Sequence, residues 1–267
     1  MIDIHCHILP FMDDGPRSVN EALEMAKVAY EDGIRKIVAT PHYIENGMVT
    51  SRDKVMKSIQ EFNYILQENS VDIEILPGHE VYFTWKIPLY VKKEEVCTLN
   101  NTQYFLMEFP LSNMPKQANE IIFRLKLMGK TPILAHPERY KEVQENPNIL
   151  IEYINMGVLC QVTSGSITGR FGKKAMETVR TLIKNNMAHF VASDGHSSRV
   201  RAPRLKSTYR KSIEVFGEEK AEKLFKINPQ KVIKGEEINI EEPIMLNKKN
   251  IVESFSYIFR VNNKRAE

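Results

Sequence analysis

The feature that most constrains the fold is a repeated alternation of short apolar runs with longer amphipathic segments. The apolar runs have the length of buried strands, and the segments between them show the apolar spacing of helices. Strands that alternate with helices form parallel sheets, because each helix crosses over to the start of the next strand. We therefore predict an α/β fold with seven parallel strands. The expected strands are 2–7, 34–40, 71–76, 104–107, 132–135, 158–162 and 188–192.

Several of the expected helices are marked by signals at their ends. Ser18 and Glu21 form a capping box, and Gly33 provides a stop. Because there is no Gly/Ser-rich linker, we expect residues 1–240 to form one large domain. A barrel and an open sheet both remain compatible with this pattern. Helices are expected at about 19–32, 53–69, 116–128, 148–155 and 173–185, in much of 205–234, and as one short helix within an irregular stretch at 84–101.

Composition limits the classes of function. Apolar residues make up 42% of the 267 residues and charged residues 27%, which is typical of a soluble globular enzyme. The net charge of +3 gives no support for nucleic-acid binding. Three cysteines without a CxxC pair make a disulfide framework improbable and favour a reducing cytoplasm. We expect neither a membrane span nor a signal peptide.

Polar side chains recur where the expected strands end. His5 and His7 are two residues apart on the first strand, so both face one side while Cys6 faces the other. In parallel barrels the carboxyl ends of the strands deliver side chains to one shared mouth. A buried, hydrogen-bonded pair is the alternative for the two histidines alone, but the recurrence favours a site. The residues at these strand ends are His5, His7, His42, Glu80, Glu108, His136, Asp194 and His196.

The ligand types predict a divalent metal site. Imidazoles and carboxylates without cysteine favour manganese, iron or zinc over a structural zinc bound by thiolates. This many ligands exceeds one ion, so we expect two or three ions bridged by carboxylates, an arrangement that suits phosphoryl displacement. His79 and His189 are expected to be structural. Asp13 and Asp14 share a loop, and the spacing alone does not choose between them.

The chain resembles a known superfamily through the motifs DIHCHILP, ATPHY, LPGHE and ASDGH. These resemble the PHP phosphoesterases, named for polymerase and histidinol phosphatase. Together with ILAHPERY and QVTSGSITGRFG, they are similar to the bacterial manganese-dependent protein-tyrosine phosphatases of capsule and exopolysaccharide loci. The resemblance covers about residues 1–230. It implies a distorted seven-stranded (β/α)7 barrel of the PHP type, similar to a TIM barrel, with three metal ions.

The resemblance also implies roles for individual residues. It selects Asp14, where many relatives have histidine, and this harder ligand favours manganese over iron and zinc. Arg139 and Arg201 match the family's phosphate-binding arginines, although Arg199 and Arg204 lie close enough to confuse the second assignment. The implied partition places His5, His7, Glu80 and Asp194 on one metal, Glu80, Glu108 and His136 on a second, and Asp14, His42 and His196 on a third.

The implied function is hydrolysis of phosphotyrosine on a bacterial tyrosine autokinase, which would regulate capsule or exopolysaccharide synthesis. A metal-bound hydroxide would attack phosphorus directly, so no cysteine nucleophile is needed. One alternative is a small-molecule phosphatase that acts on a substrate such as histidinol phosphate. Another is a metal-containing binding module without catalysis. A nuclease would want a basic groove, which the net charge does not support.

The C-terminal segment 241–267 is expected to be a basic, amphipathic tail. Basic residues flank a group of apolar residues with helical spacing, a pattern that suits contact with anionic lipid or a partner. Packing of this segment on its own domain is equally compatible with the pattern. We expect a cytoplasmic protein, with the inner face of the membrane as one location. The sequence leaves the number of subunits open, and a homo-oligomer is one option.

Overall fold

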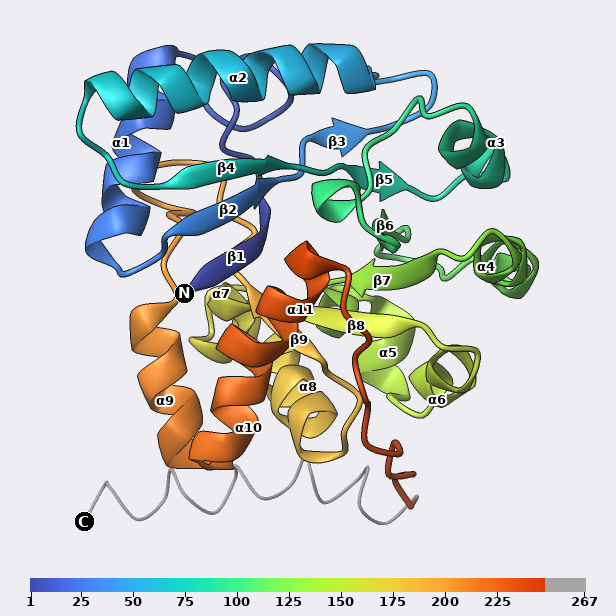
Figure 1. Cartoon of the computed structure of the whole chain (residues 1–267). Coiled ribbons are helices and arrows are strands. Elements are labelled where there is room, and N and C mark those ends of the chain that lie inside the picture. Colours follow the sequence, from blue (N-terminus) through green and yellow to red (C-terminus); the bar gives the residue numbers. More distant parts are fainter. Residues whose placement is uncertain (248–267) are drawn as a thin grey trace, which may run out of the picture.

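The strands form two parallel sheets in a computed structural model that describes residues 1–247 (Figure 1). Within these residues, one sheet has the order β1-β2-β4 and the other has the order β3-β5-β6-β7-β8-β9. All the pairs in both sheets are parallel, as predicted. The strands are β1 (Ile2–Cys6), β2 (Lys36–Ala39), β3 (His42–Tyr43), β4 (Glu74–Pro77), β5 (Glu80–Tyr82), β6 (Tyr104–Glu108), β7 (Thr131–Ala135), β8 (Leu159–Thr163) and β9 (Phe190–Ala192).

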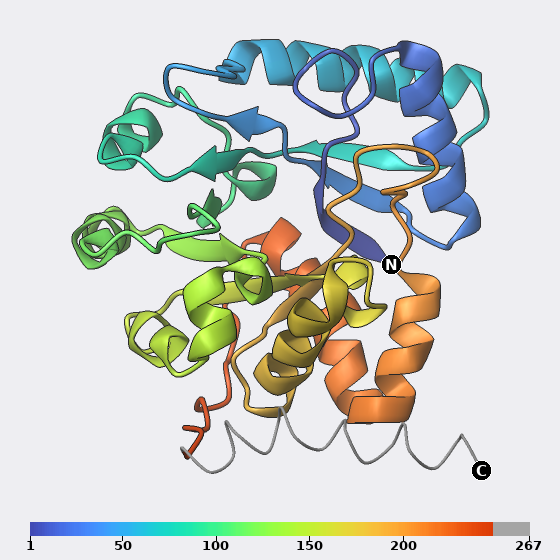
Figure 2. The same ribbon diagram turned by 180° about the vertical axis from the view of Figure 1, so that it is seen from behind.

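Helices connect the strands and cover the outer faces of the sheets (Figures 1 and 2). The predicted helices are present, with ends that differ by one or two residues, and several short helical turns are additional. The helices are α1 (Val19–Glu31), α2 (Arg52–Glu68), α3 (Ile87–Lys92), α4 (Ala118–Leu127), α5 (Lys141–Glu145), α6 (Ile149–Asn155), α7 (Ser164–Ile167), α8 (Gly172–Lys184), α9 (Lys206–Phe216), α10 (Glu218–Glu222) and α11 (Asn228–Lys234), with short turns η1 (Leu99–Asn101), η2 (Pro137–Arg139) and η3 (Lys223–Ile227).

Two of the predicted strands start later than expected, and each is followed by a short strand that was not predicted, which is why nine strands replace seven. The predicted strand 34–40 is observed as β2, and β3 follows it after Pro41, which has no N–H group to continue the ladder. The predicted strand 71–76 is observed as β4, and β5 follows it after Gly78. A Cβ atom at Gly78 would lie 2.7 Å from Val38 Cγ1, so only glycine allows this close approach of the two strands.

Alternate side chains of both sheets meet in one interior cluster. Ile4 of β1, Leu106 of β6, Ile133 of β7 and Phe190 of β9 all belong to it. Val232 of α11 packs in the same cluster. The intervening residues of the strands pack outward against the helices in a second, larger cluster. The sheets therefore enclose a core on one side and support a helical layer on the other, as period-2 alternation requires.

The first and last strands lie side by side. Cys6 at the end of β1 forms a parallel bridge with Gly195, which follows β9. The His7 N–H group donates to the Gly195 carbonyl at 2.8 Å, and the Asp194 N–H group donates to the His5 carbonyl at 2.9 Å. These bonds hold the ends of β1 and β9 together, although the two strands belong to different sheets.

The segment 236–247 forms neither helix nor strand but is hydrogen bonded to the domain. Asn148 exchanges two hydrogen bonds with the backbone of Leu246, both at 2.9 Å, and the Ile244 N–H group donates to the Asn185 carbonyl at 3.0 Å. Of the predicted amphipathic tail 241–267, residues 241–247 belong to this segment, and 248–267 lie outside the described residues. No helix within 1–247 is long and apolar enough to cross a membrane.

Candidate metal centre

The candidate site occupies the end of the interior where the strands finish. Glu108 continues the inward-facing series of Tyr104 and Leu106 on β6, and Asp194 continues that of Phe190 and Ala192 beyond β9. Glu108 and Asp194 are thus the last inward-facing side chains of β6 and β9, whereas His42 and Glu80 begin the short strands β3 and β5, and Asp14 and His196 lie in loops. The strands supply a polar layer on top of an apolar core, which is the arrangement expected at the catalytic end of a parallel fold.

A change of register in β1 directs both histidines inward. Ile4 faces the interior cluster, but the pairing with β2 shifts between Asp3 and Cys6, and Cys6 then faces the outer, helix-side core. Bulges of this kind re-aim side chains and occur next to active sites. His5 and His7 therefore face the same point, as predicted, with their Nε2 atoms 3.2 Å apart.

The first group of converging atoms belongs to these two histidines, Glu80 and Asp194. Glu80 Oε2 lies 3.3 Å from Nε2 of both His5 and His7. Asp194 Oδ1 lies 3.6 Å from His5 Nε2 and 3.7 Å from His7 Nε2. Two ligands of one ion at metal–ligand distances near 2.1 Å are separated by about 3.0–3.4 Å, so the first three atoms have the spacing of a shared coordination sphere.

A second group forms on the other oxygen of Glu80. His136 Nε2 lies 3.0 Å from Glu80 Oε1 and 3.5 Å from Glu108 Oε1. His42 Nδ1 is 3.1 Å from Glu80 Oε2, yet this buried atom makes no hydrogen bond with any described residue. A ring nitrogen and a carboxylate oxygen that lie this close without a hydrogen bond are placed as two ligands of the same cation would be. Glu80 thus contacts His136 through Oε1 and His5, His7 and His42 through Oε2, so this carboxylate is the residue that would contact more than one ion.

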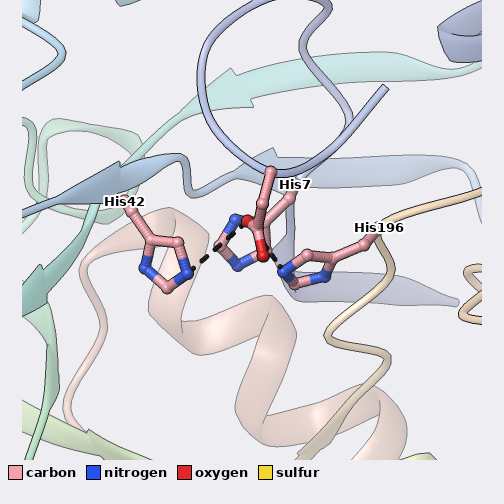
Figure 3. Close-up of side chains that lie close together, drawn as sticks. His7, His42 and His196 are labelled. Atoms are coloured by element: carbon pink, nitrogen blue, oxygen red, sulfur yellow. Dashed lines mark ion pairs between the residues drawn. The ribbon is translucent and has the colours of Figure 1, made fainter. Parts of the chain in front are cut away.

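The third group surrounds Asp14. Figure 3 shows the rings of His42 and His196 on either side of His7, and Asp14 Oδ1 lies 3.7 Å from His42 Nε2 and 3.3 Å from His196 Nε2. The ring centroids of His7 and His196 are 3.8 Å apart. The structure brings together His7, Asp14, His42 and His196 as one group, His5, His7 and Glu80 as another, and His42, Glu80 and Glu108 as a third, which overlap the implied groups without reproducing them. The implied partition therefore stays a prediction.

The charges of the site explain why it suits divalent cations. Burial opposes ionisation of Glu80, but the charges of His5 and His42 outweigh it and hold its pKa well below the usual value. Burial, followed by the charge of Glu80, raises the pKa of Glu108 to about 8. Two neighbouring carboxylates cannot both ionise easily at neutral pH without a cation between them. A bound metal ion would remove this conflict, so the donor set fits divalent metals.

Two further polar residues hold the imidazoles in position. Asp13 Oδ2 lies 2.6 Å from His7 Nδ1 and also accepts the N–H group of His42 at 2.9 Å. Gln161 Oε1 lies 2.7 Å from His5 Nδ1. An acceptor on Nδ1 fixes the tautomer that leaves Nε2 free to bind metal. Our sequence reasoning missed both roles, although Gln161 follows Leu159 in the inward-facing series of β8 and could have been found by alternation.

The two candidate arginines meet at Asp194. Arg139 Nη1 lies 3.0 Å from Asp194 Oδ2, and Arg201 Nη2 lies 2.7 Å from Oδ1. The Cζ atom of Arg139 is 4.6 Å from the centroid of the Phe171 ring, and that of Arg201 is 5.9 Å away, so one aromatic ring contacts both cations. Both guanidinium groups remain partly exposed, at 20% and 28%. They can therefore reach an anion at the edge of the metal centre.

Strained backbone supports two of the candidate ligands. His136 has a φ of 34° and Asp194 a φ of 51°, in the left-handed region that side-chain-bearing residues rarely adopt. Such strain clusters at functional sites, where the surroundings enforce it. Behind His136, buried Glu138 accepts hydrogen bonds from the Thr163 N–H group at 3.0 Å and the Ser166 hydroxyl at 2.6 Å. These bonds fix the turn that carries Arg139.

The other histidines and the cysteines lie outside the cluster. His79 accepts the Cys97 N–H group on Nδ1 and lies 2.8 Å from the Thr50 carbonyl through Nε2, so both ring nitrogens are occupied elsewhere. His189 accepts the N–H group of Cys160. Both histidines therefore have the structural surroundings that we expected. All three cysteines are free and buried, and burial raises the pKa of the thiol of each.

Comparison with known proteins identifies the family. The sequence profile of the family described as capsular polysaccharide synthesis, CpsB/CapC, matches residues 1–234. The chain belongs to this family. The match includes all nine candidate ligands and both arginines, and it ends before the segment 236–247. The CpsB/CapC family therefore accounts for the domain that carries the site.

Relatives of this CpsB/CapC chain are named as tyrosine-protein phosphatases. YwqE of Bacillus subtilis (strain 168) is 40% identical over 202 residues, which are 75% of this chain and 79% of YwqE. CpsB of Streptococcus agalactiae serotype III (strain NEM316) is 34% identical over 244 residues, with 88% of this chain and 99% of CpsB covered. A crystal structure reported for YwqE of B. subtilis and CpsB of Streptococcus pneumoniae, described as unique metal-dependent tyrosine phosphatases, matches with a TM-score of 0.90 and 34% identity, over 93% of this chain and 100% of that chain.

Proposed function

We propose that this CpsB/CapC protein hydrolyses phosphotyrosine on a bacterial tyrosine autokinase and thereby regulates capsule or exopolysaccharide synthesis. The chain is a metal-dependent protein-tyrosine phosphatase, a phosphoric monoester hydrolase like its relatives. The autokinase and the polysaccharide pathway are the further steps of the proposal. They are supported by the description of the family as one of capsular polysaccharide synthesis.

One observation carries the assignment of the site. Ring nitrogens of four histidines lie within 3.3 Å of the Glu80 carboxylate, namely those of His5, His7, His42 and His136. Two arginines contact Asp194 at the edge of the same cluster. Metal ions beside arginine forks are the groups that stabilise a phosphoryl group as it is transferred. We infer that His5, His7, Asp14, His42, Glu80, Glu108, His136, Asp194 and His196 hold two or three ions, with manganese as the most favoured metal.

The residues of the chain divide the work at this site. When bound, divalent ions lower the pKa of water towards about 7 and neutralise phosphoryl charge. Asp13 and Gln161 orient the imidazoles of His7 and His5, and Arg139 and Arg201 bind and orient the phosphoryl oxygens. The phenolic leaving group has a pKa of about 10 and so needs less protonation than a serine alkoxide. Buried, protonated thiols supply no nucleophile, so a covalent cysteine intermediate is not part of the proposal.

We also propose that the two sheets close into the distorted seven-stranded barrel implied by the sequence resemblance. Counting β2 with β3 and β4 with β5 gives seven strands, and the backbone bonds between the ends of β1 and β9 support closure. The division into a phosphatase domain at 1–240 and a tail at 241–267 remains a proposal. So do a cytoplasmic location, contact of the tail with the inner face of the membrane, and a homo-oligomer.

A comparison of substrates tests the proposed function. The protein is supplied with manganese and assayed on a phosphotyrosine peptide, the same peptide with phosphoserine, and histidinol phosphate. We expect the phosphotyrosine peptide to give by far the highest kcat/KM. A preference for histidinol phosphate would identify a small-molecule phosphatase instead, and no turnover of any substrate would identify a binding module.

A further inference from the structure

A cavity lies beside the candidate metal centre. It has a volume of about 220 Å³ and is bounded by α7, by the loop that joins β9 to α9, and by the first turn of α9. In Figure 2 the yellow helix α7 and the orange loop after β9 lie next to each other. The volume is below the roughly 300–1,000 Å³ of a typical small-molecule pocket, so the cavity suits a single side chain rather than a cofactor. None of the nine candidate ligands lines it.

The lining of this cavity is strongly basic. It includes Arg170, Arg199, Arg201 and Arg204, together with several serine and threonine hydroxyls, and it contains no acidic residue. Arg170, Arg199 and Arg204 form no ion pair with any residue in 1–247. Arginines usually find carboxylate partners when they gather at one place, because their like charges repel. Three arginines without a carboxylate partner in 1–247, beside Arg201, which is paired with Asp194, therefore constitute a site for an oxyanion.

Arg201 connects this cavity to the metal centre. Its Nη2 atom contacts Asp194, whereas the residue also lines the cavity, and its buried Nε–H group donates to no described residue. Phe171 also lines the cavity, and its ring contacts both Arg139 and Arg201. A Cβ atom at Gly165 would lie 2.9 Å from the Phe171 ring, so the absence of a side chain at Gly165 leaves room for the ring in this position. An anion in the cavity and a phosphoryl group at the metals would thus be neighbours.

The loop that joins β9 to α9, which carries Arg199, Arg201 and Arg204, is held in place by hydrogen bonds at its C-terminal end. The Ser164 hydroxyl of α7 donates to the Arg204 carbonyl at 3.2 Å. Asp32, which follows α1, accepts the Leu205 N–H group at 2.6 Å. Such anchoring lowers the entropy that is lost when a ligand binds.

We propose that this cavity binds a second anionic side chain of the same phosphotyrosyl substrate, close in sequence to the phosphotyrosine at the metals. This inference rests on the proposed function and adds a specificity site to it. Arginine forks and hydroxyls recognise phosphate and carboxylate oxygens alike, so the ligand is a second phosphorylated residue or an acidic one. Substrates with clustered phosphotyrosines or with acidic residues beside the phosphotyrosine are preferred.

The test compares peptides that differ only at the neighbouring side chain. Each peptide has a phosphotyrosine at a first, fixed position. The second position carries phosphotyrosine, glutamate or glutamine, and the number of residues between the two positions is varied. Wild-type protein with manganese should hydrolyse the best-spaced peptides that carry a second anion with a kcat/KM about tenfold above that of the glutamine peptide, the factor that one charge-assisted hydrogen bond is worth. Whether the phosphate or the carboxylate gives the larger factor identifies the ligand.

Variants assign the effect to the cavity. Arg199→Ala and Arg204→Ala should reduce the ratio of kcat/KM between anionic and neutral peptides towards one. The ratio is independent of the fraction of active enzyme, so a loss of stability does not imitate the effect. Arg210→Ala is the matched control, because Arg210 is an exposed arginine of α9 that does not line the cavity. It should leave the ratio at the wild-type value.

The outcomes separate this inference from the proposed function. If wild-type protein hydrolyses all the phosphotyrosine peptides with equal kcat/KM, the subsite is wrong and the phosphatase assignment stands. If no phosphotyrosine peptide is hydrolysed, both fail. A preference that survives in Arg199→Ala and Arg204→Ala, or that falls equally in Arg210→Ala, would overturn the assignment to this cavity.

Discussion

Asp13 Oδ2 lies 2.6 Å from His7 Nδ1, the ring nitrogen that faces away from the metal centre. Burial raises the pKa of Asp13, but the charge of His7 and its hydrogen bond outweigh burial, so the net pKa is lowered and the carboxylate is ionised. A carboxylate behind a ligating imidazole fixes the tautomer and makes the other nitrogen a stronger ligand. Asp13 therefore acts through His7, whereas its neighbour Asp14 faces His42 and His196 directly.

Replacement of Asp13 should weaken metal binding without removing a ligand. We expect Asp13→Ala to lower metal affinity by about 10- to 100-fold, the usual effect of losing such a partner. Titration of metal-free protein with manganese, followed by calorimetry, measures the affinity. Asp72→Ala, at an exposed aspartate, is the control and should bind metal as wild type does. Wild-type affinity in Asp13→Ala would show that His7 needs no support.

Activity should depend on metal and not on thiols. A chelator should abolish hydrolysis of a phosphotyrosine peptide, and added manganese should restore it, because the proposed nucleophile is water activated by metal. Alkylation of native protein should have little effect, since Cys6, Cys97 and Cys160 are at most 1% exposed. Full activity in protein shown to be metal-free by elemental analysis would refute the proposed mechanism.

The sequence predicted the order of strands and helices because both periodicities are strong in this chain. It did not predict the short strands β3 and β5 that follow Pro41 and Gly78. The apolar runs end before them, and the close packing of Gly78 on Val38 arises only when β2 and β4 are paired. The shift in β1 was also hidden, because Ile4 and His5 can both face inward only after the backbone changes register.

Eight of the nine candidate ligands could be proposed from the strand pattern because they lie where apolar runs end and a parallel fold collects side chains, whereas Asp14 was selected only by the family resemblance. Their supporting residues were harder to find. Asp13 and Asp14 are equivalent in a linear pattern, and only the folded loop directs one to His7 and the other to His196. Phe171 belongs to the motif QVTSGSITGRFG, but nothing in the sequence pattern assigned it a role, since its contact with Arg139 and Arg201 joins segments far apart in the chain.

Removal of the Arg139 side chain should affect chemistry more than metal binding. We expect Arg139→Ala to lose about 2 to 4 kcal/mol of transition-state stabilisation, the usual effect of removing one preorganised donor to developing oxyanion charge. The measurement is kcat/KM on a phosphotyrosine peptide with saturating manganese. Arg124→Ala, which removes an exposed arginine of α4, is the control.

Metal analysis of the same variant separates two roles of Arg139. Its Nη1 atom contacts Asp194, so this arginine is placed both to hold a candidate metal ligand and to bind the substrate. We expect the metal content of Arg139→Ala to equal that of wild type. Loss of metal or of cooperative unfolding in this variant would make Arg139 structural and remove it from phosphate binding.

Neutral His79 should make the fold sensitive to acid. Burial lowers the pKa of His79 to about 4, below its usual value of about 6.5. The unfolded chain therefore takes up the proton first, so stability is fully present above about pH 6.5 and is lost as the pH falls towards 4, by up to about 3 kcal/mol. His79→Gln retains an acceptor for Cys97 and a donor for Thr50 without titrating.

Urea unfolding of chelated protein at pH 7 and pH 4.5 measures this contribution. The decrease in the free energy of unfolding between the two pH values should be smaller in His79→Gln than in wild type. Chelation removes the separate effect of pH on metal binding. An identical decrease in both proteins would mean that His79 is protonated in the fold or exposed to water.

Deletion of 248–267 should leave catalysis intact and weaken association with membranes or with the kinase. The cut is placed after Asn247 because Leu246 and Ile244 are hydrogen bonded to Asn148 and Asn185, so a cut after Pro243 would also disturb the domain. We expect unchanged kcat/KM on a free phosphopeptide. Cosedimentation with anionic vesicles, and with vesicles that carry the kinase, should decrease because the deleted stretch combines basic residues with apolar ones. Equal cosedimentation of the full and shortened chains would remove the proposed role of the tail.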